Sequence, residues 1–297
     1  MPKITIHTAT YNRAYILSKA YESLRAQTCK DFEWIITDDG SSDDTELLVE
    51  AWMREDNGFP IIYNKLNHVG LNRALDSGIE KSNSDWFMRL DSDDTIIPET
   101  VEKVLLWINE IKDNDSFVGI GYAKCYPDGS YMRNQIPIID FEVGYVDATN
   151  IERKKLNMDM DMNEVYRTEL LRKYPATVWK GEMFSPEQLV TNKIALDGYK
   201  IRWRADKLYI CEYRDDGLTK DNLIVKNNPM GYAMMYNQNI IINKSFVKKC
   251  KSAIQMTALS IYAGNISYLK ESNCKAATIL TLPLGALLAV RRKKQFK

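Results

Sequence analysis

Apolar and polar positions through residues 3–110 alternate between a strand-like and a helix-like pattern. Short apolar or period-two runs recur, and each is followed by a segment whose apolar residues lie three and four positions apart. The strand-like runs are Ile4–Thr8, Phe32–Thr37, Pro60–Tyr63 and Trp86–Leu90. Four strand–helix units in a row predict a parallel sheet with helices on both faces and right-handed connections. The segment after the second strand predicts a helix that buries Leu47, Leu48, Ala51 and Trp52.

The second half of the chain has a less regular pattern. Turn residues at Pro127–Ser130 lie between two strand-like runs and predict a hairpin. Further predicted elements are strands over Phe117–Lys124, Tyr131–Arg133, Ile201–Trp203 and Leu208–Tyr213, and helices over Thr168–Lys173 and Glu187–Leu196. Beyond residue 217 the pattern is helical to the end. We therefore predict an α/β domain over residues 1–218, with halves at 1–110 and 111–218, and a helical extension over 219–297.

Polar clusters follow three of the first four strands, at the point where each strand ends. The densest is Asp91-Ser92-Asp93-Asp94, which places three carboxylates directly after a buried strand. Unpaired carboxylates near a core are costly to desolvate, so the cluster is either a site for a divalent cation or a polar turn that caps the next helix. The carboxyl ends of parallel strands lie at one edge of a sheet, where ligands bind. Thr10–Arg13 and Asp38–Asp44 should lie at the same edge, which favours the site.

Charge is distributed unevenly, although 40 basic residues balance 40 acidic ones. Residues 244–297 contain eleven Lys and Arg against one acidic residue, Glu271. Within this stretch the apolar run Ile279–Val290 ends at Arg291–Lys294 and is too short to span a bilayer. It is either an interfacial helix that binds anionic lipid or a core or dimer helix with a solvated basic end.

Several classes of protein are excluded by missing patterns. The five cysteines are scattered without a Cys-x-x-Cys pair, which predicts reduced thiols in the cytosol, and only two histidines are available for zinc. The chain lacks the glycine-rich motifs of dinucleotide folds and P-loop NTPases and the Gly-x-Ser-x-Gly of hydrolases. The basic tail lacks the interleaved aromatic residues of a nucleic-acid platform. We expect no signal peptide and no spanning helix.

Three ordered motifs carry a resemblance to a known family. Residues 8–13 (TATYNR), 32–45 (FEWIITDDGSSDDT) and 91–94 (DSDD) resemble those of the family 2 glycosyltransferases. These are inverting enzymes with the GT-A fold, a Rossmann-like and mostly parallel sheet with helices on both faces, and they use a nucleotide-sugar donor. The resemblance is strong over residues 3–110 and looser to about residue 220.

The resemblance implies roles for individual residues of the donor site. The first loop would hold the nucleotide, Asp38 or Asp39 would accept a hydrogen bond from its base, and Asp91 and Asp93 would bind Mn²⁺ or Mg²⁺ with Asp94 behind them. Asp-Gly after Asp38 is also typical of an ordinary turn. The implied donor-binding residues are Thr8, Thr10, Tyr11, Arg13, Asp38, Asp39, Arg73 and Asp91.

An inverting enzyme also needs a general base for the acceptor hydroxyl. In the family this base precedes a helix that ends in Gly-aromatic, and counting back from Gly198-Tyr199 indicates Glu187. Pro186 stands where the family has an acidic pair, so Glu182 remains an alternative base. A first-turn glutamate favoured by the helix dipole is the structural alternative for Glu187.

The family resemblance implies a non-processive transferase, because the processive Gln-x-x-Arg-Trp signature is absent. The default donor is a UDP-sugar, and the acceptor a saccharide or lipid-linked saccharide of cell-surface polysaccharide synthesis. We expect a cytoplasmic protein with peripheral contact at the inner membrane face and no nucleic-acid partner. The competing hypotheses are a sugar nucleotidyltransferase and a non-catalytic nucleotide-sugar binding protein. Residues 212–219 resemble a loop that closes over donor or acceptor, or form a surface turn.

Overall fold

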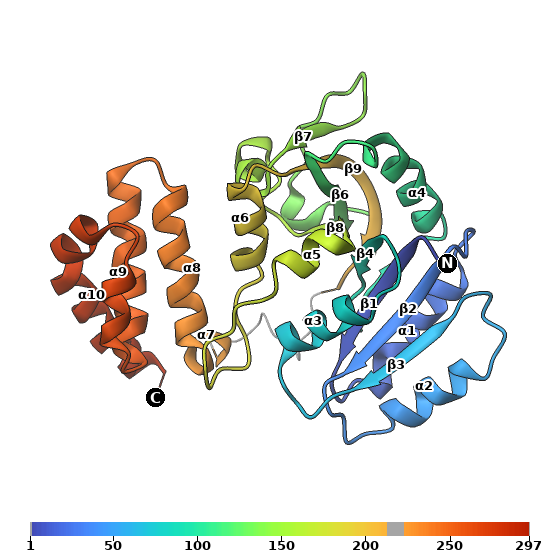
Figure 1. The fold of residues 1–297 in the computed structure, drawn as a ribbon, viewed down its shortest axis with the longest axis horizontal. Coiled ribbons are helices and arrows are strands. Elements are labelled where there is room, and N and C mark those ends of the chain that lie inside the picture. The colour runs from blue at the N-terminus through green and yellow to red at the C-terminus, as the bar shows by residue number, and fades with distance from the viewer. Residues whose placement is uncertain (1, 213–222, 297) are drawn as a thin grey trace. The chain divides into compact units, whose positions relative to one another are not determined.

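The computed structural model describes residues 2–212 and 223–296 (Figure 1). The described residues form two compact units. Residues 2–175 and 194–212 make up an α/β unit, and residues 176–193 and 223–296 make up a helical unit. The predicted class, an α/β protein with a central sheet flanked by helices and a helical C-terminal part, is confirmed. The predicted boundary at residue 218 lies outside the described residues and stays a prediction.

The α/β unit is built on one sheet with the strand order β3-β2-β1-β4-β8-β6-β9-β5, and β7 pairs with β9. The strands are β1 Ile4–Thr10, β2 Phe32–Asp38, β3 Ile61–Lys65, β4 Trp86–Arg89, β5 Thr95–Ile96, β6 Phe117–Cys125, β7 Val146–Ala148, β8 Met162–Arg167 and β9 Lys200–Ile210. Strands β1 to β4 pair in parallel, as the four strand–helix units predict. Beyond β4 the sheet is mixed, because β8 pairs antiparallel with both β4 and β6.

Helices cover both faces of this sheet. Helices α1, α2 and α4 pack on the face that carries Ile6, Trp34 and Met88, and together they form the main core. Helix α3 packs on the opposite face, where it contacts β1 and β2. The helices of this unit are α1 Ala14–Arg25, α2 Thr45–Met53, α3 Leu71–Lys81, α4 Thr100–Ile111 and α5 Thr168–Lys173, with 3₁₀ turns at Met132–Asn134 and Asn150–Leu156.

Three predicted details of the fold are wrong. Helix α2 buries Val49 and Trp52, whereas Leu47 is 66% exposed, so its buried face is rotated from the predicted one. The predicted second hairpin strand is a single bridge at Tyr131 followed by a 3₁₀ turn, in which Arg133 has a positive φ. The two predicted late strands are one strand, β9, because its pairing with β6 is interrupted after Trp203 by a bulge and resumes at Lys207.

The helical unit contains most of the basic tail. Helix α9 packs against both α8 and α10. Its helices are α7 Leu223–Asn227, α8 Pro229–Ile242, α9 Phe246–Tyr262 and α10 Lys275–Gln295, with a 3₁₀ turn at Ile266–Glu271, and α6 Gln188–Leu196 belongs partly to each unit. None of the helices within residues 2–212 and 223–296 has the length and apolarity needed to cross a bilayer.

A buried histidine fixes the distance between α3 and the sheet. The ring of His7 is 2% exposed and its Nε2 lies 2.9 Å from the Thr37 hydroxyl. Burial, reinforced by the charge of Arg89, lowers the pKa of His7 to about 3, so the ring is neutral at ordinary pH. Gly78 of α3 passes directly over it, since a Cβ at residue 78 would lie 2.2 Å from the ring.

We predict that Gly78→Ala destabilises the protein by about 2 kcal/mol or more, because the added methyl must displace α3 or the ring. Urea unfolding measures this change. Lys81→Ala, at an exposed position of the same helix, serves as the control and should change stability by no more than about 0.5 kcal/mol. A Gly78→Ala protein as stable as the control would contradict this account of the packing.

Candidate active site

The carboxyl ends of β1, β2 and β4 lie side by side at one edge of the sheet. Thr10 pairs with Asp38, and the backbone N–H of Asp39 donates to the Thr10 carbonyl at 2.8 Å. On the other side of β1, the Leu90 N–H donates to the His7 carbonyl at 2.9 Å. This register brings the three polar clusters of the sequence to a common edge, which we call the rim: residues 10–13, 38–44 and 91–94.

Basic side chains balance the carboxylates at the end of β4. Asp91 lies 3.2 Å from the Arg89 guanidinium and 3.6 Å from Nζ of Lys124. Asp93 lies 3.3 Å from the Arg13 guanidinium, so the first and third rim clusters are joined by an ion pair. Burial would raise the pKa of Asp91, but Lys124 and Arg89 outweigh it and lower the pKa to about 2. Asp91 is therefore a carboxylate at any working pH.

Asp94 has the opposite electrostatic environment. It is 7% exposed, and burial together with the charges of Asp91 and Asp93 raises its pKa to about 7. The buried phenol of Tyr209 accepts the Asp91 backbone N–H at 2.9 Å, and Lys124 Nζ lies 4.1 Å from the Tyr209 ring centroid. Lys124 and Tyr209 are two site residues that were not predicted from the sequence. Lys124 could have been recognised in the sequence as a lysine at the end of the apolar strand β6.

The raised pKa of Asp94 predicts a pH-dependent cost to stability. Between the unfolded pKa of about 4 and the folded value of about 7, only the unfolded state loses its proton, so stability falls as pH rises through this window. Asp94→Asn removes this cost. In the presence of EDTA, urea unfolding should show the variant gaining at least about 1 kcal/mol relative to wild type between pH 4 and pH 8. If the unfolding free energies of the variant and wild type differ by the same amount at pH 4 and at pH 8, the raised pKa of Asp94 is contradicted.

The donor set at the rim suits a hard divalent cation that the substrate helps to bind. Among residues 2–212 and 223–296, no group of three or more His, Cys, Asp and Glu side chains could hold a metal ion by itself. Mg²⁺ and similar ions commonly take one or two carboxylates together with substrate phosphates and water. Asp91 and Asp93 supply such carboxylates, and Arg13 would have to give up Asp93 to allow it. The residues fit an ion that is completed by a diphosphate.

The two threonines of β1 differ in what their hydroxyls do. Thr8 is fully buried, donates to the Leu90 carbonyl at 2.8 Å and accepts from Nε1 of Trp34 at 2.9 Å. It holds β1 to β4, and a contact with a donor stays a prediction. Thr10 is also buried, but its Oγ1 has no hydrogen-bond partner among the described residues. A buried hydroxyl without a partner is costly, but this oxygen is itself inaccessible, so a contact of Thr10 with a donor also stays a prediction.

Asp38 and Asp39 fold the neighbouring loop onto the rim. Asp38 accepts the Ser41 N–H at 2.8 Å and the Tyr63 hydroxyl at 2.5 Å. Asp39 accepts the backbone N–H groups of Val69 and Gly70 at 2.6 and 2.9 Å. Both carboxylates therefore have structural partners, and the contact with a nucleotide base stays a prediction.

An exposed aromatic pair lies next to these carboxylates. Tyr11 is 44% exposed and stacks on His68, with ring centroids 4.2 Å apart. Nδ1 of His68 lies 3.2 Å from Asp39, which positions the ring. Arg73 of α3 donates to the Val69 carbonyl at 2.8 Å and so supports the same loop. The pair offers a flat surface for a base, and His68 was not among the sequence candidates.

Glu182 and Glu187 lie in the helical unit and are held differently. Glu182 is 8% exposed, and its two oxygens accept the N–H groups of Met230 and Gly231 at 2.7 and 2.8 Å, at the N-terminus of α8. Burial raises the pKa of Glu182, which these N–H donors oppose. Asn228 in turn accepts two N–H groups from residues 183 and 184. The Glu182 carboxylate anchors this segment to α8.

Glu187 has the position expected of a residue that opens a helix. It is half-buried, and its carbonyl accepts the N–H groups of Val190 and Thr191 at 2.9 and 3.2 Å, where α6 begins. The helix ends before Gly198, whose φ of +91° favours glycine. A proton acceptor must be reachable, so the local structure favours Glu187 over Glu182 as a base.

We predict that Glu182→Gln destabilises the helical unit, because the amide cannot satisfy both N–H groups and loses the favourable charge at the helix N-terminus. The expected loss is about 1–3 kcal/mol. Hydrogen exchange at Met230 and Gly231 measures it locally. Glu187→Gln is the matched control and should leave exchange at these amides unchanged. Equal exchange in both variants would contradict the anchoring role.

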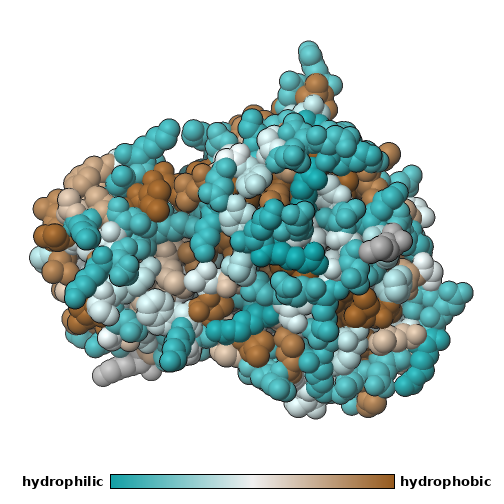
Figure 2. Space-filling model, in the orientation of Figure 1, coloured by the Kyte–Doolittle hydropathy of each residue, from teal (hydrophilic) through white to brown (hydrophobic). Residues whose placement is uncertain are grey.

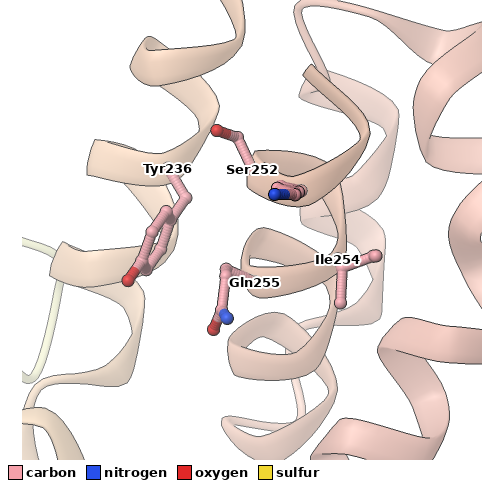
Figure 3. A pocket seen from close by; sticks show the side chains of 5 residues that line it. Tyr236, Ser252, Ile254 and Gln255 are labelled. Atoms are coloured by element: carbon pink, nitrogen blue, oxygen red, sulfur yellow. The ribbon is translucent and has the colours of Figure 1, made fainter. Parts of the chain in front are cut away.

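A pocket of about 290 Å³ lies in the helical unit, between α8 and α9 (Figure 3). Its lining residues are Tyr236, Lys251, Ser252, Ile254 and Gln255. This lining carries no carboxylate, so it does not offer the acid–base or metal chemistry of the rim. We therefore take the rim, and not this pocket, as the candidate active site.

Comparison with known proteins identifies relatives of the α/β unit. The family model for glycosyl transferase family 2 matches residues 5–175, more than half of the chain. A GalNAc(5)-diNAcBac-PP-undecaprenol beta-1,3-glucosyltransferase of Campylobacter jejuni is 31% identical over 110 residues, 37% of this chain and 36% of that protein. The glycosyltransferase GlyG of Streptococcus pneumoniae is 28% identical over 128 residues, 43% of this chain and 42% of that protein. The matches thus span less than half the length of these relatives.

Solved structures share the fold at low sequence identity. TarS 1–349 of S. aureus in complex with UDP-GlcNAc has a TM-score of 0.64 at 16% identity, over 97% of this chain and 81% of that one. The mannosyltransferase PcManGT of Pyrobaculum calidifontis, in complex with GDP-Man and Mn²⁺, has a TM-score of 0.54 at 16% identity, over 97% of this chain and 74% of that one. These likenesses support the GT-A fold.

Proposed function

The chain belongs to glycosyl transferase family 2, and we propose that it moves one sugar from a nucleoside-diphosphate sugar to a hydroxyl acceptor with inversion at the anomeric carbon. The observation that carries this proposal is the rim, where Arg13 pairs with Asp93 while Asp91 pairs with Arg89 and Lys124. Two structures with the same fold contain UDP-GlcNAc or GDP-Man, which supports a nucleotide-sugar as the donor. We take a UDP-sugar carrying a hexose as the donor.

The donor would lie along the rim with its diphosphate at the end of β4. Tyr11 and His68 would stack on the base, and the Thr10 hydroxyl would donate to the nucleotide. Asp93 and Asp91 would hold Mn²⁺ or Mg²⁺, which when bound neutralises charge that develops on the leaving diphosphate. Arg13, once it leaves Asp93, would add a guanidinium to the same phosphates, a pairing that is strong because it is charge-assisted.

The transfer step requires one proton acceptor. Glu187 would take the proton of the acceptor hydroxyl as its oxygen forms a bond to the anomeric carbon, while the bond from that carbon to the β-phosphate oxygen breaks. The nucleoside diphosphate leaves with the bonding electrons. A single displacement of this kind inverts the anomeric configuration.

For the acceptor we propose a lipid-linked saccharide. The Campylobacter jejuni relative carries such an acceptor in its name, a PP-undecaprenol glycan, and the net positive charge of residues 244–297 suits an anionic membrane surface. The protein would then act in the cytoplasm with peripheral contact at the inner face of the membrane, in cell-surface polysaccharide synthesis.

Two other functions fit the fold less well. A sugar nucleotidyltransferase would need a glycine-rich basic loop after β1, and residues 8–13 contain no glycine. A non-catalytic nucleotide-sugar binding protein would bind donor without needing Glu187. The activity of Glu187 variants separates the transferase from this second alternative.

Donor binding should appear as ligand-induced thermal stabilisation. A panel of nucleoside-diphosphate sugars with Mn²⁺ should contain one that raises Tm by on the order of 5 °C at saturating concentration, since binding to the folded state stabilises it by mass action. Asp93→Asn should lose the part of the shift that depends on Mn²⁺. Differential scanning fluorimetry measures both. A flat response to every nucleotide would contradict the proposal.

Glu187→Gln should fold and bind donor like wild type but lose transfer by about 100-fold to 10,000-fold, the usual contribution of a general base. Glu182→Gln is the matched control, and its folded fraction should retain transfer. Sugar transfer to a lipid-linked saccharide, followed by chromatography, measures both. Turnover near wild type in Glu187→Gln, with none in folded Glu182→Gln, would assign the base to Glu182 instead.

A further inference from the structure

Helix α10 packs against its neighbour through small residues. Its buried face consists of Ala277, Thr278, Thr281, Gly285 and Ala289. At Gly285 the approach of α9 is so close that a Cβ would lie 2.5 Å from Cγ2 of Thr257. None of the five buried positions of α10 carries a large apolar residue.

The outer face of α10 carries those large residues instead. Every exposed residue between positions 279 and 290 is apolar: Ile279, Leu280, Leu282, Pro283, Leu284, Leu287 and Val290. Ile279 is 73% exposed and Leu287 is 69% exposed. Figure 2 shows apolar surface at the left of the view, where Figure 1 draws α10. A surface helix of a water-soluble unit normally has the reverse arrangement, with its large apolar side chains turned inward.

Exposed apolar side chains on this scale indicate a partner. Small residues toward a neighbouring helix and large ones outward are typical of helices that pack within an apolar phase. Helix α10 has 21 residues and is long enough to cross a bilayer. Its last turn is basic, however, and the helix is not apolar enough to span a membrane. The outer face therefore suits an apolar partner that contacts only this one side of the helix.

The charges around this face decide between the partners. The face ends in the exposed basic residues Arg291, Lys293 and Lys294. Residues 244–297 contain eleven Lys and Arg against Glu271 alone among acidic residues. A second copy would bring a surface of the same sign against this one, which is unfavourable. An anionic lipid surface complements both the charge and the apolar face.

We propose that the outer face of α10 lies in the interface of an anionic membrane, with its apolar residues below the headgroups and its basic last turn among them. The helix would lie parallel to the surface. This inference deepens the peripheral contact of the proposed function and rests on that function for its lipid-linked acceptor. Its test requires no transfer and no donor.

The full chain is tested by flotation with vesicles of phosphatidylcholine alone and of equal parts phosphatidylcholine and phosphatidylglycerol. Wild type should float with the anionic vesicles only, and high salt should weaken binding. Leu280→Gln combined with Leu287→Gln should lower the bound fraction by at least about tenfold, because two leucines no longer enter the interface. Lys293→Gln with Lys294→Gln should weaken binding by about fivefold per charge.

Leu47→Gln on α2 is the matched control, since Leu47 is 66% exposed and Leu280 is 67% exposed. It should float like wild type. Circular dichroism confirms that each variant is folded. Flotation of the Leu280/Leu287 variant equal to wild type, or no flotation of wild type, overturns the proposal. Concentration-dependent dimers that this variant abolishes, without any vesicle binding, would assign the face to a second copy. Donor-induced thermal stabilisation is measured separately. A failure of vesicle flotation would therefore contradict the membrane proposal without contradicting the transferase proposal.

Discussion

The compensation of the dense negative charge at the end of β4 is the constraint on which the candidate site depends. Three carboxylates, Asp91, Asp93 and Asp94, follow a strand at the centre of the sheet. Leaving them unpaired would be costly, and the fold brings Arg89, Lys124 and Arg13 to them from three different segments. The pairing of Arg13 with Asp93 also ties the loop after β1 to the loop after β4. In the proposed function, this charge balance would be redistributed when a diphosphate and a cation bind.

The sequence predicted the part of this arrangement that depends on local pattern. Strand–helix alternation predicted the four parallel strands, and the common edge of those strands followed from topology alone. Lys124 and Tyr209 could not be predicted in the same way, because β6 and β9 reach β4 only through the mixed half of the sheet. The face of α2 was also missed, since it is set by the stacking of Trp52 on Tyr21 and Trp34 and not by spacing within the helix.

Carboxylates were the hardest residues to assign from sequence, because their partners are distant backbone groups. Asp39 and Glu182 look alike in a sequence, each being an acidic residue in a motif. In the structure each accepts two N–H groups, from residues 69 and 70 in one case and from residues 230 and 231 in the other. Such bonds position a segment, and they show how a carboxylate within a motif can serve the fold.

The most direct test is whether the rim exchanges its internal ion pairs for metal and diphosphate. Electron paramagnetic resonance measures the free Mn²⁺ and so gives the amount that is bound. Because Asp91 and Asp93 are already paired and two carboxylates alone make a weak site, the account predicts weak binding of Mn²⁺ by the protein alone. UDP should tighten it at least tenfold beyond the binding of Mn²⁺ by UDP itself, roughly the effect of one added charge-assisted contact. Asp93→Asn should abolish the gain. Equally tight binding with and without UDP, or a gain that survives in Asp93→Asn, would contradict it.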